Sequence, residues 1–484
     1  MFFIHILRVW TIIRTINKKG GFYILVKKLP KPIFWLLLVF VRRNTKDSPG
    51  KILRSIFYDL GPVFIKLGQA LSTRIDLVGE EMARELALLQ DRLPITKELY
   101  VAKTITKELG KPVEELFSSF DHKAVASASI AEVFKAKNLD GKDVAVKILK
   151  PRIRKIFKRE VAFFRWGAEV LDNYFKIAKR LKPHEVVDTF ENYMKSELDL
   201  RLEAAAAMKF SEIHQNDKHI HVPEVYWDLT SEDVLTLEWI DGIKISELNE
   251  LKKHKYDLTK LAENFVLMFF KQAFEVGMFH ADLHSGNILV NKKQQIVLLD
   301  FGIVGHLDIN SRVYIAEILN GFAKKDYDYV AKVHFEAGYI PRNQSFFLFS
   351  QACRAIGEPI VGQSSDKISI GNFFAQLLKV TRDFKMEVQP QLLLLQKTIV
   401  MTEGLAVHLS PKINLWKVTE PFVREWGKIH LALDAKIVRR IFNVIKKLED
   451  LPTSGNKTSV YIKKRKSPWV IITLFGIIIL LLIK

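Results

Sequence analysis

The sequence predicts an α+β fold in two lobes, with a helical extension before them and a membrane helix after them. A β-branched run, Asp143–Leu149, follows a turn signal at Asp140–Gly141 and is typical of a hairpin strand. Two further apolar runs, Ile288–Val290 and Ile296–Leu299, flank a polar turn and predict a second hairpin. The run Trp469–Ile483 has fifteen residues without a charge and predicts the terminal helix.

Composition limits the class of protein. The chain has 484 residues and is 48% hydrophobic, so it can bury a large core in two to four domains or lobes. Its one cysteine, Cys353, excludes an internal disulfide framework and a cysteine-only zinc site. The net charge of +20 calls for an anionic partner, which could be nucleic acid, a membrane surface or a phosphorylated ligand.

Residues 1–54 form a basic, apolar, membrane-proximal segment with twelve Lys/Arg and one acid, Asp47. Basic residues interleaved with Trp, Phe and Leu favour an interfacial helix on anionic lipid. A signal peptide is disfavoured because Arg14, Lys18 and Lys19 interrupt the first apolar run and no small-residue cleavage site follows it. An ordinary packed helical extension with a solvated basic face stays open as the alternative.

The C-terminal region reads as a helix and basic linker over 431–467 and a transmembrane anchor over 468–484. A helix over Trp469–Ile483 is about 22 Å long against a hydrocarbon core of about 30 Å. Trp469 can sit at one interface and Lys484 can snorkel at the other. The basic cluster Lys463–Lys466 should stay on the cytoplasmic side. The alternative is a buried terminal helix. Because the basic residues concentrate beside the apolar ends, a membrane is favoured over nucleic acid.

Phosphate chemistry is indicated by residues at both ends of the second hairpin. Asp282 and Asn287 lie on the loop entering one strand, and Asp300 lies just past the other, so the two carboxylates and the amide oxygen should share a pocket. Asn287 and Asp300 can supply the hard oxygen ligands that Mg²⁺ prefers. Asp282 can orient or deprotonate a phosphate acceptor. His280 and His284 flank Asp282 without a third local ligand, so we interpret His280 as a structural loop residue.

The pattern H-x-D-x-x-x-x-N followed by D-F-G resembles the catalytic core of protein kinases and small-molecule kinases. Val144-Ala145-Val146-Lys147 supplies the upstream lysine, which would hold the α/β-phosphates of ATP if an acid positions it. No glycine occurs from Lys111 to Asp140, so an Ala-rich loop replaces the Gly-rich loop and the nucleotide must be held differently. No Ala-Pro-Glu follows Asp300, which puts a protein-substrate groove in doubt.

These features together resemble the UbiB family of atypical kinase-like proteins. The K-x-G-Q signature is Lys66-Leu67-Gly68-Gln69, within Phe64–Asp76, and Leu86–Pro94 resembles the family's continuation. The Ala-rich loop and the E-x-D motif at Glu197 and Asp199 are further family features. The resemblance covers about Ile52 to Leu405 and the membrane tail.

The resemblance implies roles for individual residues. Lys147 would pair with the helix-borne Glu203, Asp282 would take the catalytic-loop position, and Asn287 and Asp300 would bind the metal. The K-x-G-Q helix would lie over the pocket, with Lys66 and Gln69 near the nucleotide and Glu197 and Asp199 as their polar partners. The residues of the loop that would cover the nucleotide are Ala126, Ser127, Ala128, Ser129, Ile130 and Ala131.

Three positions depart from the family pattern. Glu132 and Phe134 stand where relatives often carry Gln and His, and Ser285 stands where Pro is common. None of them removes a phosphate or metal ligand.

Domain boundaries follow from these motifs. The segment 1–54 precedes a helical K-x-G-Q extension over 55–120, a kinase-like small lobe over 121–240 and a large helical lobe over 241–430. The hinge is expected near Trp239–Gly242.

The resemblance also implies a function in ubiquinone biosynthesis, using ATP and Mg²⁺, at the bacterial inner membrane with the kinase-like domain on the cytoplasmic side. Expected partners are anionic membrane lipid and ubiquinone-biosynthesis enzymes or lipid intermediates, with no nucleic acid. A small-molecule or lipid phosphotransferase and a nucleotide-switched, non-enzymatic scaffold stay open as alternatives. The phosphate acceptor and the oligomeric state do not follow from the sequence.

Overall fold

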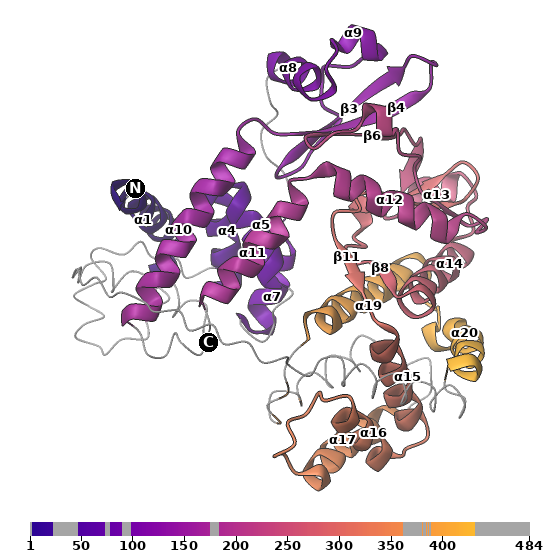
Figure 1. Ribbon diagram of the computed structural model, residues 1–484. Coiled ribbons are helices and arrows are strands. Elements are labelled where there is room, and N and C mark those ends of the chain that lie inside the picture. The colour runs from indigo at the N-terminus through magenta and orange to yellow at the C-terminus, as the bar shows by residue number, and fades with distance from the viewer. Residues whose placement is uncertain are drawn as a thin grey trace, which may run out of the picture. The chain divides into compact units, whose positions relative to one another are not determined.

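The computed structural model describes residues 2–22, 47–72, 78–89, 98–174, 183–361, 380, 384, 386 and 389–430 (Figure 1). The chain forms two compact units. Among the described residues, the first unit comprises those up to Glu212 with Pro223–Ile240, and the second comprises Ile213–Val222 with those from Asp241 to His430. The predicted linker over 431–467 and the membrane anchor over 468–484 lie outside the described residues.

The first unit combines a helical part with an antiparallel sheet. Its helices are α1 (Phe2–Lys18), α4 (Pro49–Leu60), α5 (Pro62–Ser72), α7 (Glu80–Ala87), α8 (Glu98–Leu109), α9 (Val113–Leu116), α10 (Ile153–Tyr174), α11 (Pro183–Glu197), α12 (Leu200–His214) and the 3-10 turn η2 (Trp227–Leu229). Its strands are β1 (Phe117–Phe120), β2 (Ala126–Ser127), β3 (Ala131–Asn138), β4 (Asp143–Leu149) and β6 (Val234–Glu238).

The sheet of the first unit has the order β1-β3-β4-β6, and β2 pairs with β3. Strands β3 and β4 form the predicted hairpin, with Lys137 opposite Asp143 and Gly141 at φ +77 in the turn. This left-handed conformation suits glycine, which has no Cβ to clash. Strand β6 pairs antiparallel with β4 and forms the edge of this sheet.

Helices α8 and α9 share a core with this sheet. Val101, Ile105 and Val113 pack in one buried cluster with Phe134 and Val146 of the sheet. Sequence reasoning grouped these two helices with the K-x-G-Q extension, because nothing in their own pattern indicates which surface they cover. In the structure the small lobe is therefore built from about residue 98 onward.

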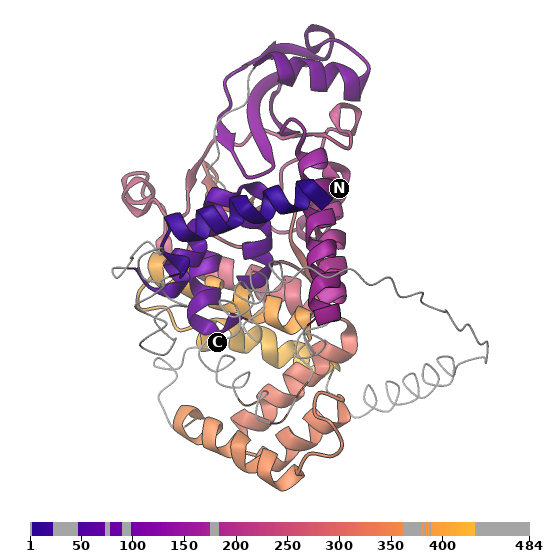
Figure 2. The ribbon, with the colours of Figure 1, turned by 90° about the vertical axis from the view of Figure 1, so that its left-hand side faces the viewer.

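Helix α1 packs against α4 (Figure 2), while its Leu7 and Trp10 are exposed. Val9, Ile12 and Ile16 are buried in a cluster with residues of α4 and α10. Arg8 adds polar contacts: its Nε donates to Glu160 of α10 at 2.8 Å, and its Nη2 donates to the carbonyl of Leu60 at the end of α4. The inner face of α1 is thus the packed extension that the sequence left open as an alternative.

The second unit consists mainly of helices, with two small sheets. Its elements are β5 (Ile220–His221), β7 (Gly242–Lys244), α13 (Leu248–Lys253), α14 (Leu258–Phe270), the π-helix η3 (Lys271–Val276), β8 (Met278–His280), the 3-10 turn η4 (Ser285–Asn287), β9 (Ile288–Asn291), β10 (Ile296–Leu298), β11 (Val304–His306), α15 (Ile309–Ala323), α16 (Tyr327–Glu336), α17 (Phe346–Val361), α19 (Pro390–Leu409) and α20 (Leu415–His430).

The second predicted hairpin is confirmed as β9 and β10, with Val290 opposite Ile296 and Ile288 opposite Leu298. It lies in a four-stranded sheet of order β5-β10-β9-β7, and a separate pair joins β8 to β11. Two helices of this unit begin at an N-capping aspartate. Asp257 accepts hydrogen bonds from two backbone amides at the start of α14, and Asp308 does so at the start of α15. The predicted α+β fold is confirmed.

Among the described residues, one helix is long and apolar enough to cross a bilayer, Gln391–Leu409 within α19. Half of this stretch is buried inside the structure. Leu395, Ile399 and Ala406 are buried, and α19 packs against α14. We therefore interpret α19 as a core helix of the second unit.

The helices α15–α17 enclose a buried histidine that makes this unit sensitive to acid. His334 is 2% exposed, its Nδ1 lies 2.8 Å from the carbonyl of Val330, and burial lowers its pKa to about 4. The neutral form is therefore favoured on folding, so the stabilisation is complete above pH 6.5 and is lost as the pH falls toward 4. Between pH 7.5 and 5 we expect this residue to cost the protein about 2 kcal/mol of unfolding free energy.

Urea unfolding at the two pH values tests this expectation. The variant His334→Phe keeps an aromatic ring beside Tyr339 and Phe349 but cannot be protonated. It should lose this part of the pH dependence. An unchanged pH dependence in the variant would contradict the assignment to His334.

Candidate functional site

In the first unit a lysine of the sheet and a carboxylate of a helix form an ion pair. Lys147 lies on the interior strand β4, and its Nζ donates to both oxygens of Glu203, at 2.7 and 2.9 Å. Glu203 lies in the first turn of α12, and both side chains are mostly buried. The ion pair fixes the lysine ammonium in one position, which is what a group that neutralises phosphate charge requires.

The Ala-rich loop is a tight, packed turn. Ala126 and Ser127 form β2 and pair with Val133 and Glu132 of β3. The amide of Ala128 donates to the carbonyl of Ala131 at 2.8 Å, and that of Lys150 donates to Ile130 at 2.8 Å. Ser129, Ile130 and Ala131 are buried. Small side chains let the turn close without the positive φ angles that a Gly-rich loop uses.

The K-x-G-Q motif lies on α5, where its three residues have different contacts. Lys66 is 8% exposed and its Nζ lies 3.0 Å from Glu197 of α11, whose other oxygen accepts a hydrogen bond from Tyr193. The amide of Gln69 donates to the carbonyl of Leu89 at 3.1 Å. A Cβ on Gly68 would lie 2.3 Å from a methyl of Leu89, so only glycine permits this packing. The segment 73–77 lies outside the described residues.

Asp199 has a local role in the structure. Its carboxylate accepts hydrogen bonds from the backbone and guanidinium of Arg201, and its carbonyl accepts the amide of Leu202 at the start of α12. The hydrogen bond from the Arg201 side chain is the main cause of a lowered pKa for this carboxylate. Asp199 therefore caps the helix that carries Glu203.

The second unit joins the two loops that carry Asp282, Asn287 and Asp300. The amide of Ala281 donates to the carbonyl of Ile303 at 3.0 Å, and the amide of Leu299 donates to the carbonyl of Asn287 at 2.8 Å. The strands before and after these loops, β8 and β11, are paired. The loops that carry the carboxylates and the amide oxygen are therefore held on adjoining backbone.

His280 is a structural residue of this loop. The amide of Asp282 donates to its Nδ1 at 3.2 Å, so Nε2 carries the proton and donates to the carbonyl of Leu299 at 3.1 Å. The ring is fully buried, which lowers its pKa and keeps it neutral. This neutral tautomer ties the Asp282 loop to the segment that leads into Asp300.

A π-helical turn supports His280 from behind. Gln272, on η3, accepts a hydrogen bond from the amide of His280 at 3.1 Å and donates to His214 Nε2 at 2.9 Å. Gln272 is fully buried and His214 is 5% exposed. A π-helix is rare and often lies at a functional site. The sequence carries no signal for this turn, so sequence reasoning missed Gln272.

Gln272→Leu should lower the unfolding free energy by about 2 to 4 kcal/mol, because it leaves the His280 amide and the His214 ring nitrogen buried without partners. Urea unfolding measures the change. Lys271→Met, an exposed position on the same turn, is the matched control and should stay near the wild-type value. Equal unfolding free energies for the two variants would show that the hydrogen bonds of Gln272 do not stabilise the fold.

Asp300 has an unusual backbone conformation, with φ +56. Left-handed backbone is uncommon outside glycine, although Asp and Asn tolerate it best. Its carboxylate accepts a hydrogen bond from the amide of Gly302 at 3.2 Å, which stabilises this turn. Such backbone strain is concentrated at functional sites.

Asp282 has a partner that the sequence did not reveal. Lys397 of α19 donates to its carboxylate at 3.1 Å, and His284 Nε2 lies 3.7 Å from the other oxygen. Burial is the largest single influence and acts to raise the pKa of Asp282, but the charge and hydrogen bond of Lys397, together with the charges of His284 and His280, outweigh burial, so the pKa is lowered. Asp282 is therefore held as a carboxylate. A lysine within a largely apolar helix was the sequence feature that could have indicated this contact.

The oxygen donors in this unit fit a magnesium ion that also binds phosphate. Asn287 Nδ2 donates to the carbonyl of Asp282, which leaves its Oδ1 available, and Asp300 supplies a carboxylate. Within the described ranges no cluster of three His, Cys, Asp or Glu side chains could hold a metal alone. Mg²⁺ commonly takes one or two protein oxygens and completes its coordination with water and phosphate. Asn287 and Asp300 are the residues that would hold it.

Comparison with known proteins agrees with the geometry. Residues 88–334 match the ABC1 atypical kinase-like domain, and residues 353–414 match the UbiB helical domain. A "Probable protein kinase UbiB" from Pseudomonas fluorescens (strain SBW25) is 37% identical over 450 residues, covering 90% of this chain and 84% of the relative. One of the same name from Actinobacillus pleuropneumoniae serotype 5b (strain L20) is 41% identical over 406 residues, covering 82% of this chain and 74% of the relative.

A solved structure supports the fold. The complex of Rv3197 with erythromycin from Mycobacterium tuberculosis has a TM-score of 0.52 and 24% identity, covering 75% of this chain and 93% of that one. The domain match extends over half of this chain, and both relatives are bacterial proteins aligned over most of their length. The chain therefore belongs to the UbiB family of atypical, kinase-like proteins.

Proposed function

We propose that this protein binds Mg-ATP and uses it, by phosphoryl transfer or hydrolysis, to support ubiquinone biosynthesis at the bacterial inner membrane. Family membership implies the role in ubiquinone biosynthesis. One observation supports the use of ATP most directly: hydrogen bonds to the backbone connect the Asp282–Asn287 loop to the segment that contains Asp300. These residues bring together the hard oxygen ligands and the carboxylate that phosphoryl transfer needs.

The first unit carries a fixed ammonium that is suited to binding phosphate. The ammonium of Lys147, fixed by Glu203, can neutralise charge on the α/β-phosphates without reorganising during the reaction. In the second unit Asp282 is ionised beside Lys397 and can orient the attacking oxygen of an acceptor. A bound Mg²⁺ would neutralise the phosphate oxygens.

A small acceptor is favoured over a protein acceptor. The chain lacks an Ala-Pro-Glu after Asp300, and Lys66 of the K-x-G-Q helix is fixed by Glu197. Water or a lipid intermediate of ubiquinone synthesis fits these features. The product of the reaction separates the two: free phosphate alone supports an ATPase, and a stoichiometric phosphorylated lipid supports a phosphotransferase.

The outer face of α1 supports contact with an anionic membrane. Leu7 and Trp10 are each 59% exposed, and the guanidinium of Arg14 lies 5.4 Å from the Trp10 ring. An exposed Trp beside basic residues is typical of a helix at a lipid interface. This arrangement, with the basic composition of residues 1–54, fits the cytoplasmic face of the inner membrane.

The test is phosphate release from Mg-ATP by the purified full-length protein, with neutral vesicles and with vesicles that contain anionic phospholipid. Wild type should release phosphate, anionic vesicles should increase the rate, and Lys147→Met should abolish release. Nucleotide binding without release, together with complementation of a deletion strain by Asp282→Asn, would instead indicate a switched scaffold. Absence of nucleotide binding, or normal ubiquinone levels in the deletion strain, would refute the proposal.

A further inference from the structure

The turn between α11 and α12 lies between two carboxylates of the candidate site. Glu197, at the end of α11, binds Lys66 at 3.0 Å. Glu203, in the first turn of α12, binds Lys147 at 2.7 Å. Five residues separate them, so the conformation of this turn determines whether both carboxylates reach their lysines.

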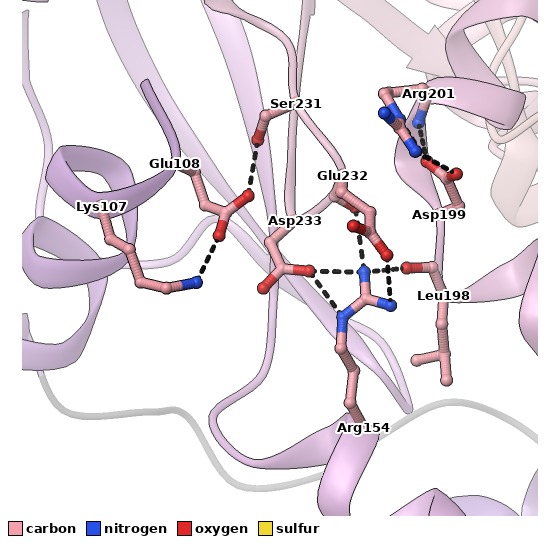
Figure 3. A network of polar contacts seen from close by, with 9 residues as sticks. All are labelled: Lys107, Glu108, Arg154, Leu198, Asp199, Arg201, Ser231, Glu232 and Asp233. Carbon is pink, nitrogen blue, oxygen red and sulfur yellow. Dashed lines mark hydrogen bonds and ion pairs between the residues drawn. The ribbon is translucent and has the colours of Figure 1, made fainter. Parts of the chain in front are cut away.

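Arg154, in the first turn of α10, holds this turn from outside the candidate site (Figure 3). Its Nη2 donates to the carbonyl of Leu198 at 2.5 Å. The same guanidinium donates to Asp233 Oδ1 from Nε at 2.8 Å and from Nη2 at 2.6 Å, and its Nη1 forms an ion pair with Glu232 at 2.7 Å. One guanidinium thus joins the turn to the loop before β6.

That loop also holds the strand that carries Lys147. The carbonyl of Glu232 accepts the amide of Leu200 at 3.0 Å, and the carbonyl of Asp233 accepts the amide of Leu149 at 3.0 Å. Glu108 of α8 receives a hydrogen bond from Ser231 on the same loop (Figure 3). The loop before β6 therefore contacts both the turn before Glu203 and the end of β4. Arg154 binds this loop through the side chains of Glu232 and Asp233.

We propose that Arg154 is a positioning residue for the two lysine–carboxylate pairs, an inference that rests on the proposed function. Its planar guanidinium has donors enough for one carbonyl and two carboxylates at once, which a lysine ammonium cannot match in geometry. Its side chain is 35% exposed, so water can replace its hydrogen bonds when it is removed. Removal should loosen the turn while the buried Leu198 and Leu200 keep the fold together.

Arg154→Ala and Arg154→Lys in the full-length protein test this role, with Arg165→Ala as the matched control. Arg165 also joins α10 to α11 through its guanidinium, by ion pairs to Asp188 and Glu191, but away from the turn. Two measurements are made on each variant: amide hydrogen exchange of residues 197–203, and kcat and KM for phosphate release per folded molecule.

In Arg154→Ala we expect exchange over 197–203 to become about tenfold faster and kcat/KM to fall by about 10- to 100-fold, since small misplacements of reacting groups have effects of this size. Arg154→Lys should be intermediate, and Arg165→Ala should resemble wild type in both measurements.

Exchange over 197–203 equal to that of Arg165→Ala would overturn the proposal, whatever the activity. Faster exchange with an unchanged kcat/KM would also overturn it, because Arg154 would then be structural only. If the wild-type protein releases no phosphate, the proposed function fails, and the exchange comparison still decides whether Arg154 sets the turn.

Discussion

Asp300→Asn should lower phosphate release from Mg-ATP by about a hundredfold to a thousandfold, the size of effect seen when one charge-stabilising group is removed from an active site. The substitution removes the negative charge that would hold a divalent cation against the phosphates. It should leave the fold unchanged, because Asn tolerates φ +56 as well as Asp does and its side-chain oxygen can still accept the hydrogen bond from Gly302. The unfolding free energy should stay within about 0.5 kcal/mol of wild type.

Asp300→Ala provides the contrast. Alanine lacks both the tolerance for left-handed backbone and the side-chain acceptor, so we expect it to cost about 1 to 2 kcal/mol of stability in addition to the activity. A second left-handed residue, Gln294 in the turn between β9 and β10, is a control for backbone strain alone. Gln294→Gly should stabilise the protein slightly and leave phosphate release unchanged. Full activity in Asp300→Asn would remove Asp300 from the proposed site.

Features set by local pattern could be predicted from the sequence. The two hairpins follow from β-branched runs flanked by turn residues, and the second of them places Asp282, Asn287 and Asp300 on adjoining backbone. The pairing of Lys147 with Glu203 could be anticipated only through the family resemblance, since 56 residues separate them and neither has a distinctive pattern of its own.

Features set by tertiary packing could not be predicted. Lys397 lies 115 residues beyond Asp282 on a helix whose composition alone also suits a membrane span. Gln272 reaches His280 because a π-helical turn directs it there, and helical periodicity does not reveal such a turn. Arg154 resembles many other basic residues of this +20 chain, and only its contacts distinguish it.

The ion pair between Lys397 and Asp282 carries the second large prediction. Lys397→Met should lower the unfolding free energy at neutral pH by about 1 to 3 kcal/mol, because a mostly buried carboxylate loses its cation while the methionine still fills the apolar helix. Phosphate release should fall by about 10- to 100-fold as Asp282 loses its fixed position.

The loss of Lys397 should also change how stability and phosphate release depend on pH. In the wild-type protein the folded-state pKa of Asp282 is lowered, so this carboxylate adds stability above its unfolded pKa of about 4 and loses it as the pH falls through the folded value. Without Lys397 we expect burial, the largest single influence on this pKa, to outweigh the remaining charges and to raise the pKa instead. The acid limb of the pH profile for phosphate release should then move toward neutral pH, and the loss of stability on acidification should become smaller.

Two further variants separate the charge pair from general damage to α19. The double variant Asp282→Asn with Lys397→Met contains no unpaired charge, so it should regain most of the stability lost in Lys397→Met and none of the activity. Lys412→Met, at an exposed position just after α19, should match wild type in both measurements. If Lys397→Met kept the wild-type stability and acid limb, the lysine would have no energetic role at Asp282, and the ionised state of that carboxylate would have to come from its backbone surroundings and His284.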